Sequence, residues 1–159
     1  MRKIIKYLFI TLLIVNIKGC VIGSPKPDYK MKLVQNYELW KVNNNRIVIG
    51  TTDGDGFLDS NIKGKVIELD YNDEYIIARS IPTYKADEKD FSNLQEKDKY
   101  IESIPEKDYE FWIIAVENNI VYGPFNEENF NKKRNEILVP ESMALEKLEN
   151  YEKYFEYVE

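Results

Sequence analysis

The chain has 159 residues, a length that fits one domain of ordinary size. It is 43% hydrophobic and 31% charged, which excludes collagen-like and wholly disordered chains. The absence of histidine excludes Ser-His-Asp and Cys-His catalytic groups, and the single cysteine excludes an intrachain disulfide.

Residues 1–19 have the pattern of a bacterial signal peptide. Arg2, Lys3 and Lys6 precede an almost uninterrupted apolar run over residues 7–17. This run has the length of a signal-peptide core, whereas a helix that spans a bilayer needs about 20 apolar residues. A buried core helix is the alternative, although such a helix would not usually begin with three basic residues.

The signal peptide ends in a sequence that resembles a lipobox, the motif read by lipoprotein signal peptidase. Ile17, Gly19 and Cys20 match the motif, and Lys18 stands where a small residue is expected. The resemblance implies cleavage before Cys20 and a diacylglyceryl group, carrying acyl chains such as palmitate, on its sulfur. Two or more acyl chains hold a protein firmly on the cell membrane, here on its extracytoplasmic side. A secreted protein and an uncleaved signal anchor are the alternatives.

The charge of the processed chain bears on its partners. Cleavage before Cys20 removes four basic residues and no acidic one, so the net charge moves from −6 to −10. An acidic chain of this kind is repelled by nucleic acid. We therefore expect the protein to attach to the membrane through the lipid on Cys20, and we expect no nucleic-acid partner.

The remaining chain divides into a tether and one domain. Residues 20–34 contain Pro25 and Pro27, which stiffen a linker, beside flexible Gly23 and Ser24. Residues 35–159 predict a single α+β domain, with an antiparallel sheet of about six strands built from hairpins and one or two C-terminal helices packed on it.

Six segments have strand patterns, namely residues 37–42, 46–50, 65–71, 74–80, 110–116 and 120–122. Asn43-Asn44-Asn45 is a natural turn between the first two. In residues 65–71 the alternation places Ile67, Leu69 and Tyr71 on one face and Val66, Glu68 and Asp70 on the other. The apolar run from Phe111 predicts a central strand that is covered on both faces.

The C-terminal third predicts two helices. Gly123-Pro124 is expected to end the last strand, and Asn126 to cap a short helix over about residues 127–137. Its inner face would carry Phe130, Arg134 and Ile137. A second helix is predicted beyond Pro140, where apolar side chains recur at helical spacing at Leu145, Leu148, Phe155 and Val158.

Residues 81–109 form a long charged excursion between two predicted strands. The segment is bounded by Pro82 and Pro105 and predicts a helix over about residues 87–100. A connection this long is uncommon unless it is functional or disordered, so it is either a solvated excursion or a recognition loop. Lys97 and Lys99, like Lys132-Lys133-Arg134, lie among acids and predict solvated helix faces.

No catalytic or cofactor-binding residue is predicted. Asp53, Asp55 and Asp59 have the early spacing of a calcium loop, but Leu58 and Gly64 occupy the positions that need Gly and Glu. They stay weak metal candidates, and a glycine-rich turn between strands is favoured. The sequence contains no nucleophile elbow, P-loop or dinucleotide-binding motif.

Several short motifs resemble a family of small predicted lipoproteins from Bacillus and related Firmicutes, known only as a domain of unknown function. They are Tyr37-Glu38-Leu39, Tyr75-Ile76-Ile77-Ala78, Phe111-Trp112-Ile113-Ile114, Asn118-Asn119 and Val121-Tyr122-Gly123-Pro124-Phe125, with Phe130 and Arg134. The likeness covers about residues 35–140, and the excursion over 81–109 and the acidic C-terminal segment look like departures. The resemblance implies a membrane-tethered domain outside the cytoplasm.

These observations favour a non-enzymatic, membrane-tethered module that binds an envelope protein or another envelope component. An inhibitor or immunity-like protein is a narrower form of this hypothesis. An envelope hydrolase that uses a pair of carboxylates is the less favoured alternative, supported only by the abundance of acidic residues.

Overall fold

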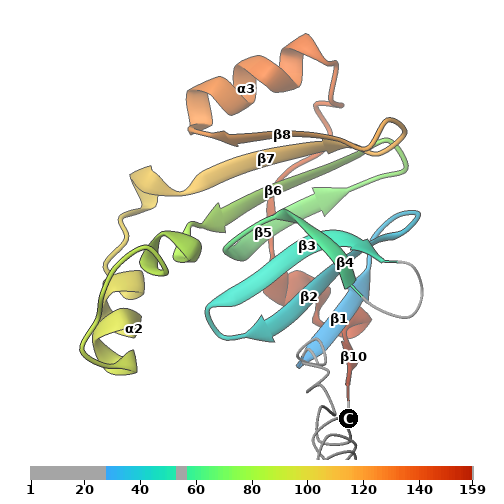
Figure 1. Cartoon of the computed structure of the whole chain (residues 1–159). Coiled ribbons are helices and arrows are strands. Elements are labelled where there is room, and N and C mark those ends of the chain that lie inside the picture. Colours follow the sequence, from blue (N-terminus) through green and yellow to red (C-terminus); the bar gives the residue numbers. More distant parts are fainter. Residues whose placement is uncertain (1–27, 53–56, 159) are drawn as a thin grey trace, which may run out of the picture.

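A curved sheet organises residues 28–52 and 57–158, which are the residues that the computed structural model describes (Figure 1). Its strands are β1 (Tyr29–Lys32), β2 (Tyr37–Asn43), β3 (Arg46–Thr52), β4 (Phe57–Ile62), β5 (Lys65–Tyr71), β6 (Tyr75–Ile81), β7 (Glu110–Ala115), β8 (Ile120–Phe125), β9 (Glu146–Lys147) and β10 (Glu156–Tyr157). The order is β10-β1-β2-β3-β5-β6-β7-β8, while β4 also pairs with β3 and β9 with β5. Pairing among these strands is antiparallel except at β3 and β5, where Ile47 lies opposite Lys65.

The predicted α+β fold with an antiparallel sheet is confirmed in outline, because the sheet is mostly antiparallel and a C-terminal helix packs on it. The sheet has ten described strands, however, where about six were predicted. All six predicted strands are present with small shifts of their ends. The additional strands are short or polar. β1 falls within the segment assigned to the tether, and β4 (FLDSNI) lacks the alternation of a half-buried strand.

The predicted faces of β5 are correct from Glu68 to Tyr71 and wrong at Val66, because the strand contains a bulge between Val66 and Glu68. Val66 lies opposite Ser80 and Glu68 lies opposite Arg79, so Ile67 is an extra residue. The bulge turns Val66 to the same side as Leu69, and both are fully buried in one core. Glu68 faces the opposite side, where its carboxylate lies 3.3 Å from the Arg79 guanidinium.

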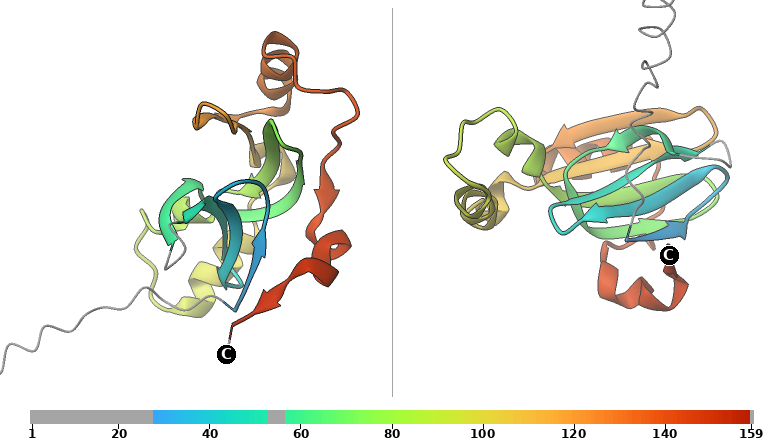
Figure 2. Two further views of the ribbon diagram at one scale, coloured as in Figure 1. Left: turned by 90° about the vertical axis from the view of Figure 1, so that its right-hand side faces the viewer. Right: turned by 60° about the horizontal axis from the view of Figure 1, so that its bottom comes forward.

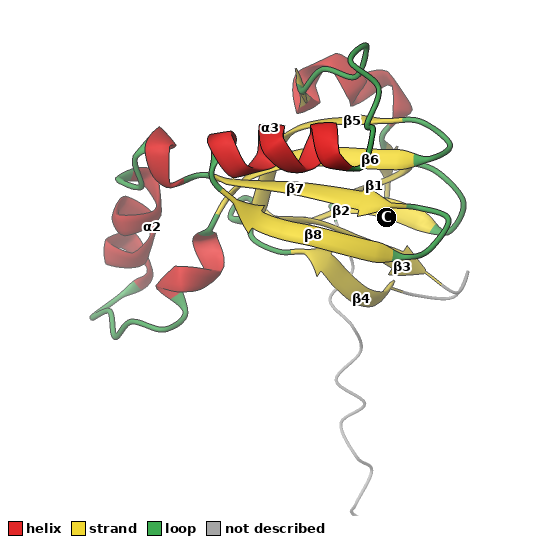
Figure 3. Ribbon diagram, turned by 90° about the horizontal axis from the view of Figure 1, so that it is seen from above, coloured by secondary structure: helices red, strands yellow, loops and turns green. Residues whose placement is uncertain are grey.

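Two hydrophobic cores cover the two faces of β6 and β7, which confirms the prediction of a central strand from Phe111. The larger core lies inside the curved sheet and includes Leu39, Ile49, Leu69, Ile76 and Ile114. The smaller core lies under helix α3 (Glu127–Glu136) and includes Ile77, Phe111, Ile113, Phe130 and Met143. Figure 3 shows α3 lying over the sheet.

Helix α3 follows the sequence prediction. The Asn126 side chain accepts a hydrogen bond from the Asn129 amide at 2.9 Å, as expected of an N-cap. The ring of Phe130 lies 5.1 Å from that of Phe111 and attaches the helix to β7. The predicted strand end at Gly123-Pro124 is wrong, since β8 continues to Phe125. β8 is an edge strand, which tolerates a proline because one side of it needs no hydrogen-bond donor.

The second C-terminal helix is not an α-helix. Residues 146–157 form β9, the 3₁₀ helix η3 (Leu148–Tyr154) and β10. The backbone of this segment pairs with β5 at one end and with β1 at the other, so the chain extends between these two strands. Leu148, Tyr151 and Phe155 pack against the larger core from there. The apolar side chains of this segment therefore pack against the core, although the segment does not form a regular α-helix.

The charged excursion is ordered and stands at one end of the sheet (Figure 2). It contains the 3₁₀ helices η1 (Thr83–Ala86) and η2 (Glu106–Asp108) on either side of helix α2 (Leu94–Glu102). Helix α2 begins later than predicted because Asn93 caps it, accepting a hydrogen bond from the Glu96 amide at 2.9 Å. Among the described helices, none is long and apolar enough to cross a membrane.

Candidate functional site

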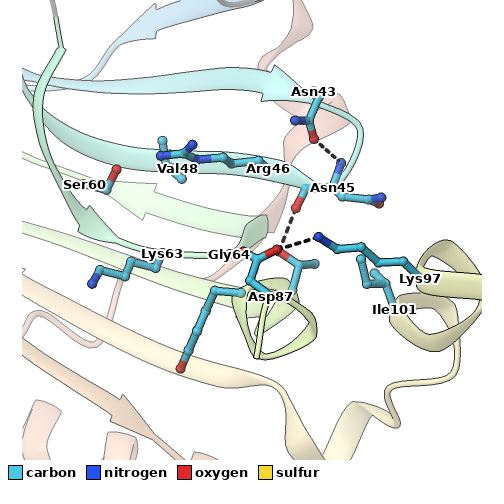
Figure 4. Close-up of a pocket in the computed structure, with 12 residues that line it drawn as sticks. Asn43, Asn45, Arg46, Val48, Ser60, Lys63, Gly64, Asp87, Lys97 and Ile101 are labelled. Atoms are coloured by element: carbon cyan, nitrogen blue, oxygen red, sulfur yellow. Dashed lines mark hydrogen bonds and ion pairs between the residues drawn. The ribbon is translucent and has the colours of Figure 1, made fainter. Parts of the chain in front are cut away.

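A polar pocket of about 570 Å³ lies where the charged excursion meets the sheet (Figure 4). We call it the polar pocket throughout. The described residues that line it are Asn43, Asn45, Arg46, Val48, Ser60, Lys63 and Gly64 from the sheet and its turns, and Thr83, Tyr84, Asp87, Lys97 and Ile101 from the excursion.

The sheet wall of the pocket follows from strand alternation. Ile47 and Ile49 of β3 point into the larger core, so Arg46 and Val48 point to the opposite face. Ser60 of β4 lies across from Gly50 on the neighbouring strand. The Ile47 amide donates a hydrogen bond of 3.1 Å to the Gly64 carbonyl, which holds the Lys63-Gly64 turn beside the start of β3.

Gly64 permits this close arrangement. Its φ of +90° lies in the left-handed region, and a Cβ there would lie 2.4 Å from the Ile81 carbonyl oxygen. Only glycine fits such a position without displacing the neighbouring backbone. The end of β6 and the start of the excursion are therefore held directly against the turn.

The other wall of the pocket is attached to the Asn43–Asn45 turn. The Thr83 hydroxyl donates to the Asn45 carbonyl at 2.7 Å, and the Asn45 side-chain amide donates to Asp98 of α2 at 2.7 Å. Lys97 of α2 lies 2.5 Å from Asp87, so this pair links α2 to the residue that follows η1. Lys97 was predicted to belong to a solvated helix face, and it forms part of the pocket wall instead.

Buried Glu110, the first residue of β7, anchors η1. The Tyr84 hydroxyl donates to both Glu110 carboxylate oxygens, at 2.9 and 3.0 Å, and the Lys85 ammonium lies 2.7 Å from one of them. The pKa of Tyr84 is raised from 10.0 to about 12, chiefly by burial and in smaller part by the hydrogen bond to Glu110 and its negative charge. Tyr84 thus stays protonated and remains a donor at neutral pH.

The pocket carries an excess of positive charge. Arg46, Lys63 and Lys97 line it together with a single carboxylate, Asp87, which pairs with Lys97. Within the described part of the chain, Arg46 and Lys63 form no ion pair. The side chains of the polar pocket thus supply positive charge and hydrogen-bond donors on a surface cavity.

The residues singled out from the sequence lie elsewhere. Cys20, Asp53 and Asp55 are outside the described residues. β3 ends at Thr52 and β4 begins at Phe57, which brackets the predicted glycine-rich turn. The backbone of Asp59 lies opposite Thr51, and its side chain is outside the described set. Among the described residues, no group of three or more acidic or cysteine side chains could hold a metal ion.

Sequence reasoning did not single out Arg46, Lys63 or Ser60, since each is an isolated polar residue that belongs to no recognisable motif. Two signals did point to this region. The Asn43-Asn44-Asn45 turn and the long excursion were both recognised, and the structure joins them through Thr83 and Asp98. What the sequence lacks is any local sign that the two segments meet.

Comparison with known proteins identifies a family. The model of the family described as "Protein of unknown function (DUF3997)" matches residues 34–149, which includes the excursion that we expected to depart from the family pattern. No curated protein and no solved structure matches the sequence. The matched range covers more than two thirds of the chain, and the chain therefore belongs to the DUF3997 family of proteins of unknown function.

Proposed function

We propose that the protein is an extracytoplasmic lipoprotein, anchored through Cys20, whose domain is a non-enzymatic binding module that takes an envelope component into the polar pocket. The basic and apolar pattern of residues 1–19 and the lipobox-like sequence before Cys20 support the anchor. The pocket supports the binding role.

One observation carries the binding role: the excursion is built into the domain rather than left in solvent. Four side chains attach it to the sheet, since Thr83 bonds the Asn43–Asn45 turn, Asp98 accepts from Asn45, and Tyr84 and Lys85 bond Glu110. Long connections that are ordered on a rigid sheet commonly carry binding residues. The resulting cavity, at about 570 Å³, lies within the size range of small-molecule pockets.

The anchor is tested by fatty-acid labelling in the native host. Wild-type protein should incorporate the label and sediment with membranes, and Cys20→Ala should do neither. Labelling that does not depend on Cys20, or its absence from wild-type protein, would remove the anchor from the proposal and leave the pocket to be tested separately.

The binding role is tested by photo-crosslinking in intact cells. A photoreactive amino acid is placed at Asn44, an exposed residue in the turn at the pocket rim, and a matched control replaces Asn135 on α3. We expect a defined crosslinked product from position 44 and none from position 135. Identical products from both positions, or none from either, would contradict binding at the pocket. The identity of the product separates an envelope component from a toxin-like target.

A further inference from the structure

We propose that the polar pocket binds a phosphate group, either free inorganic phosphate or a phosphate monoester, between Arg46 and Lys63. This inference rests on the proposed function, because it names the chemistry of the ligand for the same pocket.

The charge of the pocket is opposite to that of the chain. The chain as a whole has a net charge of −6, whereas the pocket is lined by three cations and one carboxylate. Lys97 and Asp87 neutralise each other in an ion pair of 2.5 Å. Arg46 and Lys63 are left as two positive charges that no described carboxylate balances. An anion repelled by the rest of the surface is therefore attracted here.

Within the pocket wall, hydrogen bonds occupy acceptor oxygens and leave several donor groups without a described partner. Asn43 Oδ1 accepts from the Asn45 amide at 2.9 Å, and the Asn45 carbonyl accepts from Thr83 at 2.7 Å. The Asn43 side-chain NH₂ and the Ser60 hydroxyl have no partner among the described residues. With the guanidinium of Arg46 and the ammonium of Lys63, these groups form a set of donors that an anionic oxygen ligand satisfies.

All four donors belong to the sheet and its turns, on one wall of the polar pocket. Arg46 extends from the start of β3 along the same face as Ser60 of β4 (Figure 4), and the bond from Ile47 to Gly64 keeps Lys63 next to that strand. Guanidinium groups bind phosphate with two parallel hydrogen bonds, and lysine adds a point charge.

A phosphate group fits the charge better than a carboxylate does. A phosphate monoester carries about −1.5 to −2 at pH 7, which balances two cations, whereas a carboxylate carries one negative charge. The excess of two positive charges thus favours a phosphate over a carboxylate-bearing sugar or peptide terminus.

The test is titration calorimetry with the full chain in mild detergent and phosphate-free buffer of constant ionic strength. The probes are inorganic phosphate, glycerol 3-phosphate and dihexanoyl phosphatidic acid, with acetate for comparison. We expect at least one phosphate probe to bind at a single site with a higher affinity than acetate. The tightest probe shows whether the source is free phosphate, a soluble ester or a lipid headgroup.

Variants locate the binding in the pocket. Arg46→Ala/Lys63→Ala should weaken phosphate binding tenfold or more, and Ser60→Ala several-fold. A double variant that also removes two exposed cations, Lys132→Ala/Lys147→Ala, should bind as the wild type does. Circular dichroism and thermal melting verify that each variant is folded. Arg46→Lys should restore part of the affinity that Arg46→Ala loses.

Two outcomes would overturn the inference. One is a wild-type protein that binds no phosphate probe tighter than acetate, and the other is an equal loss in the pocket and control double variants. Neither outcome decides the proposed function, because crosslinking from Asn44 would still reveal a partner of other chemistry. Phosphate binding without a crosslinked envelope component would instead support the anion site and contradict the wider proposal.

Discussion

The Tyr84 hydroxyl lies 2.9 and 3.0 Å from the two carboxylate oxygens of Glu110, and this pair connects the excursion to the central strands. Glu110 is only 6% exposed and is the one charged residue that is buried within the described part of the chain. It begins β7, whereas Tyr84 lies in η1 and lines the polar pocket. The pocket wall thus depends on a carboxylate that lies outside the pocket.

Glu110→Gln should therefore destabilise the protein and loosen η1. The glutamine keeps the size of the side chain but loses the charge that pairs with Lys85. Breaking a fully buried ion pair costs about 3–5 kcal/mol. The Lys85 side chain is 46% exposed and can turn to water when its partner is lost. We therefore expect Glu110→Gln to lower the free energy of unfolding, measured with urea, by about 1–2 kcal/mol. Hydrogen exchange should quicken across residues 83–102.

The matched control is Glu106→Gln. This residue also forms an ion pair, at 3.7 Å from Arg79, but its side chain is 82% exposed. Exposed pairs contribute about 0–1 kcal/mol, so this variant should remain close to the wild type. Equal urea midpoints for the two variants would show that Glu110 does not anchor the excursion.

High pH should destabilise the fold through its buried tyrosines. The pKa values of Tyr29, Tyr84 and Tyr151 are each raised to about 12, chiefly by burial. In the unfolded chain tyrosine ionises near pH 10, so above that pH the folded state binds more protons than the unfolded state. The stability is fully present below pH 10 and falls as the pH rises from about 10 towards 12.

Each of these tyrosines removes at most about 1.4 kcal/mol of stability per pH unit in that window. Urea unfolding at several pH values between 8 and 11.5 measures the slope, and absorbance at alkaline pH follows tyrosinate formation. Tyr84→Phe should make the fall of the free energy of unfolding with pH less steep, by the contribution of one tyrosine. A stability that stays constant up to pH 11.5 would contradict the raised pKa values.

The sheet could be predicted largely from residue patterns, and the failures have physical causes. Alternation predicted β5 at the correct residues, but a bulge at Ile67 reverses the faces before and after it. A bulge depends on how the neighbouring strand pairs, which the sequence of one strand does not contain. Likewise, the helical spacing beyond Pro140 fits η3 only in part, because backbone pairing with β5 and β1 competes with helix formation.

The candidate site was harder to predict than the fold. Arg46 and Lys97 are more than 50 residues apart in the sequence and line the same pocket, where Asn45 is hydrogen-bonded to both Thr83 and Asp98. Side-chain hydrogen bonds between distant segments leave no periodic signal in a sequence. The length and charge of residues 81–109 did indicate a feature of interest, and the structure shows where that segment is attached.

Gly64→Ala tests how tightly the turn of the pocket is packed. A methyl group there would lie 2.4 Å from the Ile81 carbonyl oxygen, and φ is +90°. Strain and steric overlap together should cost more than about 2 kcal/mol of stability in urea unfolding. The neighbouring exposed variant Lys63→Ala should change stability by less than about 0.5 kcal/mol. A Gly64→Ala protein as stable as Lys63→Ala would show that the turn is not constrained.

Leu138→Gly should make the protein more stable. Leu138 follows the last turn of α3 with φ of +58°, a conformation that glycine adopts without strain. The Val139 amide donates a hydrogen bond of 2.9 Å to the Arg134 carbonyl, and the Leu138 amide donates one of 3.4 Å to the Asn135 carbonyl. This pair of hydrogen bonds is the pattern of a Schellman motif.

The Leu138 side chain is 82% exposed, so its loss removes little packing. Relief of the left-handed strain should raise the free energy of unfolding by about 0.5–1 kcal/mol, measured by urea unfolding. Leu138→Ala keeps a Cβ and therefore keeps the strain, so it should match the wild type within about 0.5 kcal/mol. If glycine instead destabilised the protein, the exposed leucine would be making a contact that offsets the strain of its backbone.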